Sequence, residues 1–202
     1  MKRPQAARFA SAPTPSRGRR LWLVRHAQPL VAPGLCYGRL DLAADRDATA
    51  QAAAALAAAL PDCAVFTSPQ RRCRQLAVAL QARRPDLRPE VDERLREFDF
   101  GTWEGQAWDA IGAAALDAWT ADFAHHAPGG GETVRALLAR VGAAFEASRA
   151  LAQAEVAWIT HAGVARAASV WAAGRRTPGS AADWPHAAPG FGGWVTLEMP
   201  AT

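Results

Sequence analysis

Short apolar runs alternate with longer helical patterns along this 202-residue chain, and this alternation constrains the fold more than any other feature. Three runs are bounded by breaking or polar residues: "LWLVR" at 21–25, "AVFTS" at 64–68 and "VAWIT" at 156–160. Brief apolar runs of this kind are typical of strands buried in a parallel sheet. Their alternation with helices predicts an α/β fold, a three-layer α/β/α sandwich with a mostly parallel central sheet.

The segments between these runs carry helical signals. Asp45 is predicted to cap an Ala-rich helix over 46–60. A second helix is predicted from Ser68-Pro69 to about residue 84, with Pro69 in the first helical position. The remaining apolar spacing predicts helices over 106–123, 133–154 and 163–173, and a last strand over 193–199.

The distribution of charge divides the chain into a leader and a folded body. Residues 1–20 hold six basic and no acidic residues and are rich in Ala, Pro and Ser, which predicts a disordered basic leader. Without them, 17 basic and 19 acidic residues remain, so residues 21–202 carry a formal net charge of −2. A domain with this charge is not expected to bind nucleic acid.

Composition also limits the location and the cofactors that we expect. No apolar run approaches the length of a membrane span, so no membrane attachment is expected. Three cysteines occur at spacings that match neither a metal knuckle nor a redox pair, which indicates reduced thiols in a cytoplasmic protein. No Asp, Glu or His cluster has metal-ligand spacing, so neither a metal nor another cofactor is expected. A homodimer stays an open alternative to a monomer.

Polar residues follow each of the three predicted buried strands. Arg25 and His26 end the first strand, Ser68 ends the second, and His161 follows the third. Because active sites of open α/β sheets lie at the carboxyl ends of the strands, these residues are expected to meet in one crevice. The sequence therefore predicts an active site at this edge of the sheet.

Five residues expected in this crevice form a set suited to phosphoryl transfer: Arg25, His26, Arg72, Glu97 and His161. Guanidinium groups present forked donors that match phosphate oxygens. A neutral imidazole can attack phosphorus and form a covalent phosphohistidine. A nearby carboxylic acid can protonate the leaving alkoxide and then deprotonate the attacking water.

Each of these residues, taken singly, also has an ordinary structural explanation. A histidine after a strand is usually structural, and an arginine on a first helical turn is usually solvated. Glu97 could form an ion pair with Arg94 or Arg96. The functional interpretation depends on finding the residues together at the ends of successive strands.

Five segments, in order, resemble motifs of the histidine phosphatase superfamily, the phosphoglycerate mutase-like enzymes: "LWLVRHAQP", "TSPQRRCRQLA", "LREFDFGTWEG", "PGGGETVRALLARV" and "WITHAGVARA". The resemblance spans about residues 21–199. It implies that His26 is the phosphorylated nucleophile and Glu97 the proton donor. It also implies that Arg25, Arg72 and His161 clamp the phosphoryl group.

The chain departs from the family pattern at several positions, among them Leu76 and Asp45, each of which stands where the family has a threonine. Ala27 and Ala162 replace family glycines, so both need ordinary backbone angles. Ala32 stands where many members carry an asparagine that touches phosphate. None of these changes removes a reacting group.

The compact stretch from Glu97 to the Gly-rich turn at 129–131 favours hydrolysis over mutase activity. The loop "APGLCYGRLDL" resembles that of α-ribazole phosphatases, so α-ribazole 5′-phosphate is a candidate among small phosphomonoesters. Tyr37 and Trp103 are predicted to form an aromatic wall for a flat base, with Arg39 a further candidate for substrate binding. Tyr37 could equally pack the loop. A mutase, a phosphohistidine-protein phosphatase and a non-catalytic phosphate-binding protein remain open as alternatives.

Overall fold

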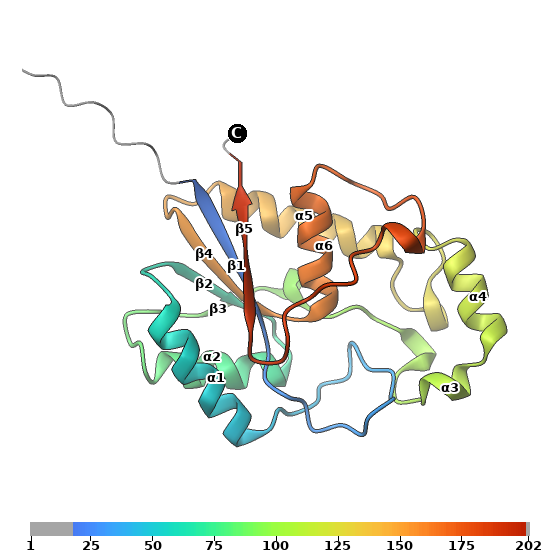
Figure 1. The fold of residues 1–202 in the computed structure, drawn as a ribbon, viewed down its shortest axis with the longest axis horizontal. Coiled ribbons are helices and arrows are strands. Elements are labelled where there is room, and N and C mark those ends of the chain that lie inside the picture. The colour runs from blue at the N-terminus through green and yellow to red at the C-terminus, as the bar shows by residue number, and fades with distance from the viewer. Residues whose placement is uncertain (1–17, 201–202) are drawn as a thin grey trace, which may run out of the picture.

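A five-stranded sheet with the strand order β3-β2-β4-β1-β5 forms the centre of the computed structural model, which describes residues 18–200 (Figure 1). β2 pairs in parallel with β3 and β4, and β4 pairs in parallel with β1, whereas β5 is antiparallel to β1. The strands are β1 (Arg19–Arg25), β2 (Ala64–Thr67), β3 (Glu90–Val91), β4 (Glu155–Thr160) and β5 (Trp194–Met199).

Helices cover both faces of this sheet (Figure 1). One layer contains α1 (Arg46–Ala59) and α2 (Arg71–Gln81), and the other contains α5 (Val134–Arg149) and α6 (Ala162–Ala172). Two shorter helices, α3 (Trp108–Ile111) and α4 (Ala113–Ala121), lie outside the layers. The predicted three-layer α/β/α sandwich with a mostly parallel sheet is therefore confirmed. No helix within residues 18–200 has both the length and the apolar character that a membrane span requires.

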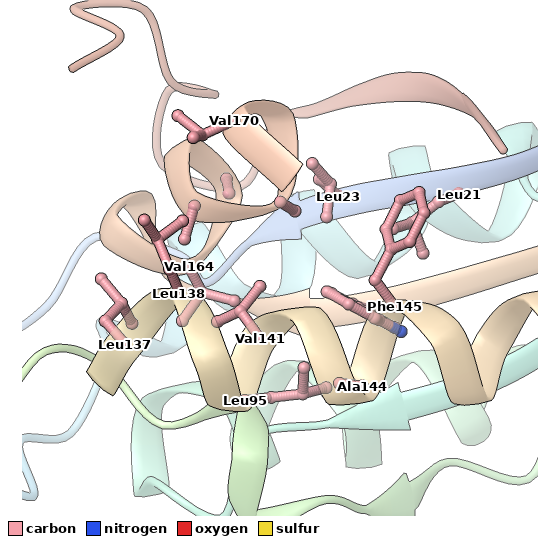
Figure 2. Close-up of a cluster of buried hydrophobic side chains, with 14 of the residues drawn as sticks. Leu21, Leu23, Leu95, Leu137, Leu138, Val141, Ala144, Phe145, Val164 and Val170 are labelled. Atoms are coloured by element: carbon pink, nitrogen blue, oxygen red, sulfur yellow. The ribbon is translucent and has the colours of Figure 1, made fainter. Parts of the chain in front are cut away.

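The side chains of β1 point alternately to the two faces of the sheet and so contribute to the hydrophobic core on each face. Leu21 and Leu23 pack with α5 and α6, where Figure 2 shows them facing Val141 and Phe145. Trp22, the residue between them, packs with the opposite core against α1 and α2. Side chains of a strand point alternately to the two faces, so an apolar run buried on both sides fits a central strand.

Two predicted helix starts are confirmed by their capping bonds. The side chain of Asp45 accepts a hydrogen bond from Ala48 N at 2.8 Å at the start of α1. Thr133 Oγ1 accepts one from Ala136 N at 3.1 Å at the start of α5. Such caps satisfy backbone N–H groups that have no partner within the helix.

The predicted boundary between leader and domain, after residue 20, is wrong. β1 begins at Arg19, so Arg19 and Arg20 belong to the sheet. Arg20 Nε donates a hydrogen bond to the Glu155 carboxylate at 2.9 Å on the neighbouring strand, which explains why a basic residue is accepted there. The predicted disorder of the leader otherwise concerns residues 1–17, which lie outside the described residues.

The predicted helical position of Pro69 is also wrong. Ser68 N still donates to Ile159 O at 2.9 Å, so the chain remains extended past the end of β2. Gln70, with φ −67° and ψ 139°, is the N-cap residue, and α2 begins at Arg71. The shift places Arg72 in the second helical position.

The single helix predicted over 106–123 is broken in two. Gly112 has φ +84° and ψ 145°, a conformation that ends α3 and precedes α4. Glycine adopts positive φ at little steric cost, so the break falls at this residue. The short strand β3 was not predicted, because its two exposed residues carry no apolar pattern.

We expect Gly142→Ala to lower the free energy of unfolding by up to about 2 kcal/mol. A Cβ at Gly142 would overlap the Trp171 ring where α5 packs on α6, and overpacking of this kind typically costs about 1–3 kcal/mol. The gain in helix propensity, about 1 kcal/mol, offsets only part of this cost. Urea denaturation measures the difference. The control is the exposed Ala139→Gly on the same helix, which should lose about 1 kcal/mol through propensity alone. A stabilised Gly142→Ala variant would contradict the packing described here.

Candidate active site

The carboxyl ends of β1, β2 and β4 bring the predicted residues together. His26 N donates to Thr160 O at 3.0 Å, which continues the β1–β4 pairing beyond the end of the strands. Ser68 follows β2 and His161 follows β4. The rings of His26 and His161 lie edge to face, with centroids 5.2 Å apart. These strand ends therefore meet at one edge of the sheet, as expected. Of the predicted residues, Arg25, His26 and Glu97 line the pocket there, whereas Arg72 and His161 are fully buried beside His26.

The hydrogen bonds of His26 assign its tautomer. The ring is 2% exposed, and Nδ1 lies 2.7 Å from Ala27 O. A carbonyl oxygen only accepts hydrogen bonds, so Nδ1 carries the proton and donates. Nε2 is then the nitrogen with the lone pair, and it accepts from Arg72 Nε at 3.2 Å. This arrangement leaves Nε2 as the basic atom of the ring.

Burial and two arginines hold His26 in the neutral form. Burial lowers the pKa of His26 most, Arg72 and Arg25 lower it further, and the bond to Ala27 O opposes them, which brings the pKa to about 3. A neutral imidazole is the form that can act as a nucleophile. His26 is therefore neutral at neutral pH.

We expect no titration midpoint for His26 between pH 5 and pH 7.5. Unfolded histidine binds a proton near pH 6.5, whereas the folded pKa of His26 is about 3, so protonation favours unfolding as the pH falls between these values. The test is the pH dependence of the imidazole 15N chemical shifts, with the His26 signals assigned by their loss in His26→Ala. A midpoint near 6.5 would show that the ring is more solvated than the structure indicates.

Arg72 projects from the first turn of α2 and is fully buried. Its Nη1 donates to Leu40 O and its Nη2 to Gly38 O, both at 2.7 Å. Together with the bond from Nε to His26, these contacts fix the plane of the guanidinium against the nucleophile. One hydrogen on each Nη atom is left over for an anion.

Arg25 lies at the end of β1 on another side of His26. Its Cζ lies 3.8 Å from the centroid of the Phe191 ring, and Nη1 donates to Pro189 O at 3.1 Å. Burial lowers the pKa of Arg25, while Tyr37 and Glu97 act in the opposite direction. Its Nε is buried and has no partner within residues 18–200. Buried donors of this kind are normally satisfied, so a ligand oxygen is a natural partner.

His161 is also fully buried and electrically neutral. Its Nε2 lies 2.8 Å from Ser68 Oγ and 3.4 Å from Cys73 Sγ. Burial, followed by Arg72 and His26, lowers the pKa of His161 well below its ordinary value. As a neutral ring it can offer one N–H group to an anion without adding a charge.

Backbone amides hold the Glu97 carboxylate in place. Oε1 accepts from Phe98 N at 3.0 Å, and Oε2 accepts from Gly163 N at 3.1 Å at the start of α6. A Cβ at residue 163 would collide with the Glu97 carboxylate, so a larger residue there would displace the carboxylate from this position. Gln70 Oε1 accepts from Glu97 N at 2.7 Å and fixes the main chain of the same residue.

The structural alternative for Glu97 is not found. Arg94 donates to Asp92, and Arg96 donates to Glu93. Both arginines thus have other carboxylate partners, and Glu97 remains directed at the crevice.

A pocket of about 440 Å³ opens beside His26, Arg25 and Glu97. Tyr37 lines it, as predicted, and its ring centroid lies 5.6 Å from Arg72 Cζ. The rest of the wall is mostly apolar, and six aromatic residues contribute to it: Phe98, Phe100, Trp108, Trp119, Phe123 and Trp184. The crevice can therefore accept a phosphate group together with a sizeable attached group.

Two predicted substrate-binding residues lie elsewhere. Trp103 is 8% exposed and packs behind the wall, with its centroid 5.9 Å from that of Trp119. Arg39 is exposed, donates to the Asp99 carboxylate at 2.9 Å and lines a separate cavity. Of the predicted pair, Tyr37 lines the pocket and Trp103 does not.

Most of the pocket wall was missed in the sequence. Trp108 and Trp119 fall within the helix predicted over 106–123 without a functional role, and Phe123 and Trp184 carry no motif. Arg166, which also lines the pocket, stood in a quoted motif without a role. The signal that could have identified the wall is the concentration of aromatic residues between Phe98 and Phe123.

Comparisons with known proteins identify the family of this chain. The model of the histidine phosphatase superfamily (branch 1) matches residues 21–188. The structure of mycobacterial glucosyl-3-phosphoglycerate phosphatase with VO3 is 30% identical over 89% of this chain and 92% of that chain, with a TM-score of 0.74.

Two further solved structures are similar to this chain. A protein from Thermus thermophilus is 30% identical over 90% of this chain and 95% of that chain, with a TM-score of 0.69. A mycobacterial protein described as hydrolase 1 is 29% identical over 89% of each chain, with a TM-score of 0.73. No curated protein matches the sequence. On the match to the family model and on these likenesses, the chain belongs to branch 1 of the histidine phosphatase superfamily and is an enzyme of the phosphatase class.

Proposed function

We propose that the enzyme hydrolyses small phosphomonoesters through a covalent phosphohistidine on His26. The observation that carries this proposal is the pair of bonds to the His26 ring, from Nδ1 to Ala27 O and from Arg72 Nε to Nε2. The first fixes the proton away from the reacting nitrogen, and the second places a cation beside it. The bond from Arg72 Nε breaks as substrate binds, which frees the single lone pair of Nε2 for the attack. In the first step, Nε2 forms a bond to phosphorus as the bond between phosphorus and the leaving oxygen breaks.

Glu97 is the proposed general acid and base. In the first step its protonated carboxyl gives a proton to the leaving alkoxide, so a neutral alcohol departs. In the second step the carboxylate takes a proton from water, whose oxygen attacks phosphorus and releases Nε2 of His26. The support for this role is its place in the pocket wall beside His26.

Arg25, Arg72 and His161 are the proposed clamp for the phosphoryl oxygens. The transferring group carries its charge mainly on these oxygens, so preorganised donors lower the barrier. The remaining hydrogens of Arg72 and the unpartnered Nε of Arg25 within residues 18–200 support this assignment. A resident metal or other cofactor is not part of the proposal.

Hydrolysis is proposed over mutase activity because the segment from Glu97 to Gly131 is compact and the solved relatives include a phosphatase. α-Ribazole 5′-phosphate is the proposed candidate substrate, supported by Tyr37 in the pocket wall. A cytoplasmic location, the absence of nucleic-acid and membrane partners, and the choice between monomer and homodimer stay predictions.

A panel of phosphomonoesters tests the proposed function. It should include α-ribazole 5′-phosphate, and 3-phosphoglycerate should be assayed for both phosphate release and mutase products. We expect release of inorganic phosphate, with water as the acceptor, and no mutase product. Transfer to 3-phosphoglycerate with little release would favour the mutase alternative.

Activity is expected to survive prolonged treatment with a strong chelator. The proposed steps use only side chains of this protein, so the rate with an aryl phosphate should be unchanged after dialysis against EDTA. The matched sample receives the same treatment followed by zinc or magnesium. A rate that falls on chelation and returns with the metal would show that the proposed mechanism lacks a component.

A further inference from the structure

The aromatic residues of the pocket wall form one connected surface. Trp119 lies at its centre, with ring centroids 6.2 Å from Phe98, 6.0 Å from Phe100 and 5.5 Å from Phe123. Phe123 in turn lies 5.8 Å from Trp184, which follows the short 3-10 helix at 181–183. These contacts bring α4, the segment after Glu97 and the segment before β5 into a single apolar wall.

The polar groups of the pocket are mainly those already assigned to the phosphoryl group. Beyond Arg25, His26 and Glu97, the described lining adds the hydroxyl of Tyr37, the guanidinium of Arg166 and the indole N–H groups of three tryptophans, Trp108, Trp119 and Trp184. Arg166 Nη2 already donates to His186 O at 3.1 Å, whereas Arg166 Nε and Trp119 Nε1 are buried without a partner within residues 18–200. These two donors could serve a few acceptor atoms but not a chain of hydroxyl groups. A polyol, or a sugar that bears no flat ring system, would therefore place most of its hydroxyl groups against ring carbons, where they lose water without gaining hydrogen bonds.

We propose that the preferred substrates are phosphomonoesters whose leaving alcohol carries a planar, uncharged, apolar ring. This inference rests on the proposed function, and it assigns the wall centred on Trp119 as the site for that ring. Apolar pockets of about 300–1,000 Å³ commonly bury most of a small ligand, and this one is about 440 Å³. Offset and edge-to-face contacts with the wall would select flat rings over flexible chains.

Trp184 is the proposed specificity residue. It is half-buried at one end of the connected surface, with Phe123 as its aromatic neighbour, whereas Trp119 has four such neighbours. Removing Trp184 should therefore disturb the wall less than removing Trp119. The phosphoryl site should remain intact.

Substrates that differ only in the attached group test the proposal on the unaltered enzyme. We compare 2-(2-naphthyl)ethyl phosphate with ethyl phosphate, because both release a primary alkoxide and make the same demand on Glu97. The expected kcat/KM for the naphthyl ester is at least about tenfold higher, the scale of discrimination that apolar pockets provide. 3-Phosphoglycerate is the third substrate. Its carboxylate could form an ion pair with Arg166, so it tests whether the pocket prefers a charged group to an apolar ring.

Substitution of Trp184 tests whether the preference for the naphthyl ester arises at this wall. Trp184→Ala should remove most of the advantage of the naphthyl ester and leave kcat/KM for ethyl phosphate within about twofold of the unaltered value. The matched control is Trp171→Ala, another half-buried tryptophan, which lies on α6 and donates to Glu146 instead of lining the pocket. Trp171→Ala should leave the ratio of kcat/KM for the naphthyl ester to kcat/KM for ethyl phosphate unchanged. Thermal midpoints of both variants confirm that they are folded at the assay temperature.

The outcomes separate this inference from the proposed function. Hydrolysis of all three substrates with no preference for the naphthyl ester, or with 3-phosphoglycerate preferred, would overturn the inference while the proposed function stands. A naphthyl preference that Trp184→Ala leaves intact would overturn the assigned ring site. Phosphate release from none of the esters would contradict the proposed function and the inference together.

Discussion

Replacing His26 with alanine is expected to abolish hydrolysis of every phosphomonoester, with a loss in kcat on the order of 10⁴-fold or more. No phosphoenzyme can form without the imidazole, and the arginines beside it cannot replace a nucleophile. The loss should be the same for alkyl and aryl phosphates, because both need the same acceptor in the first step. The measurement is the steady-state rate of phosphate release.

A second histidine supplies the control for this experiment. His125 is exposed and contacts Asp122, so His125→Ala should leave the rates unchanged. The fold of His26→Ala is checked by its circular dichroism spectrum and thermal midpoint. Turnover retained in a folded His26→Ala variant would mean direct attack by water, and the covalent mechanism would be wrong.

The second large effect is expected for Glu97→Gln, and it should depend on the leaving group. An alkoxide is a poor leaving group that needs a proton, so an alkyl phosphate should lose about 10²- to 10⁴-fold in kcat/KM. A nitrophenolate departs without a proton, so the loss on a nitrophenyl phosphate should be less than about tenfold. Measuring kcat/KM for both substrates in both enzymes gives the comparison.

Glu93→Gln is the matched control, since Glu93 is an exposed carboxylate in the same segment and pairs with Arg96. It should change neither rate. Equal losses on the two substrates in Glu97→Gln would assign the proton donor to another residue.

Several of the reacting residues could be predicted because they lie at the end of a short apolar run in the sequence. Arg25, His26 and His161 come directly after apolar runs that only a buried strand explains, and parallel strands bring their carboxyl ends to one edge. Glu97 was harder to place from spacing, because its carboxylate is held by amides of Phe98 and of Gly163, the second of which lies 66 residues away in the sequence. The resemblance to the family supplied its role before the structure supplied its contacts.

The pocket wall could not be predicted, because it depends on packing between distant segments. Trp184 contacts Phe123 only because of the path that the chain takes after α6. The apolar periodicity of the sequence does not predict that contact. Trp103 was placed beside Tyr37 by its closeness to Glu97 in the sequence, but it turns behind Trp119 into the core. Similarly, the choice of Gly112 as a helix break depends on its backbone angle and not on the apolar spacing around it.

The phosphoenzyme is the central claim, and a rapid-quench single turnover tests it most directly. Excess enzyme is mixed with a 32P-labelled phosphomonoester and quenched in alkaline denaturant, because a phosphohistidine is labile in acid. The account predicts label on the peptide that contains His26, at Nε2, appearing before inorganic phosphate and decaying at the rate at which phosphate forms. Phosphate that forms at the full rate while no label accumulates on any residue, even in Glu97→Gln, where attack by water should be slowed, would contradict the account.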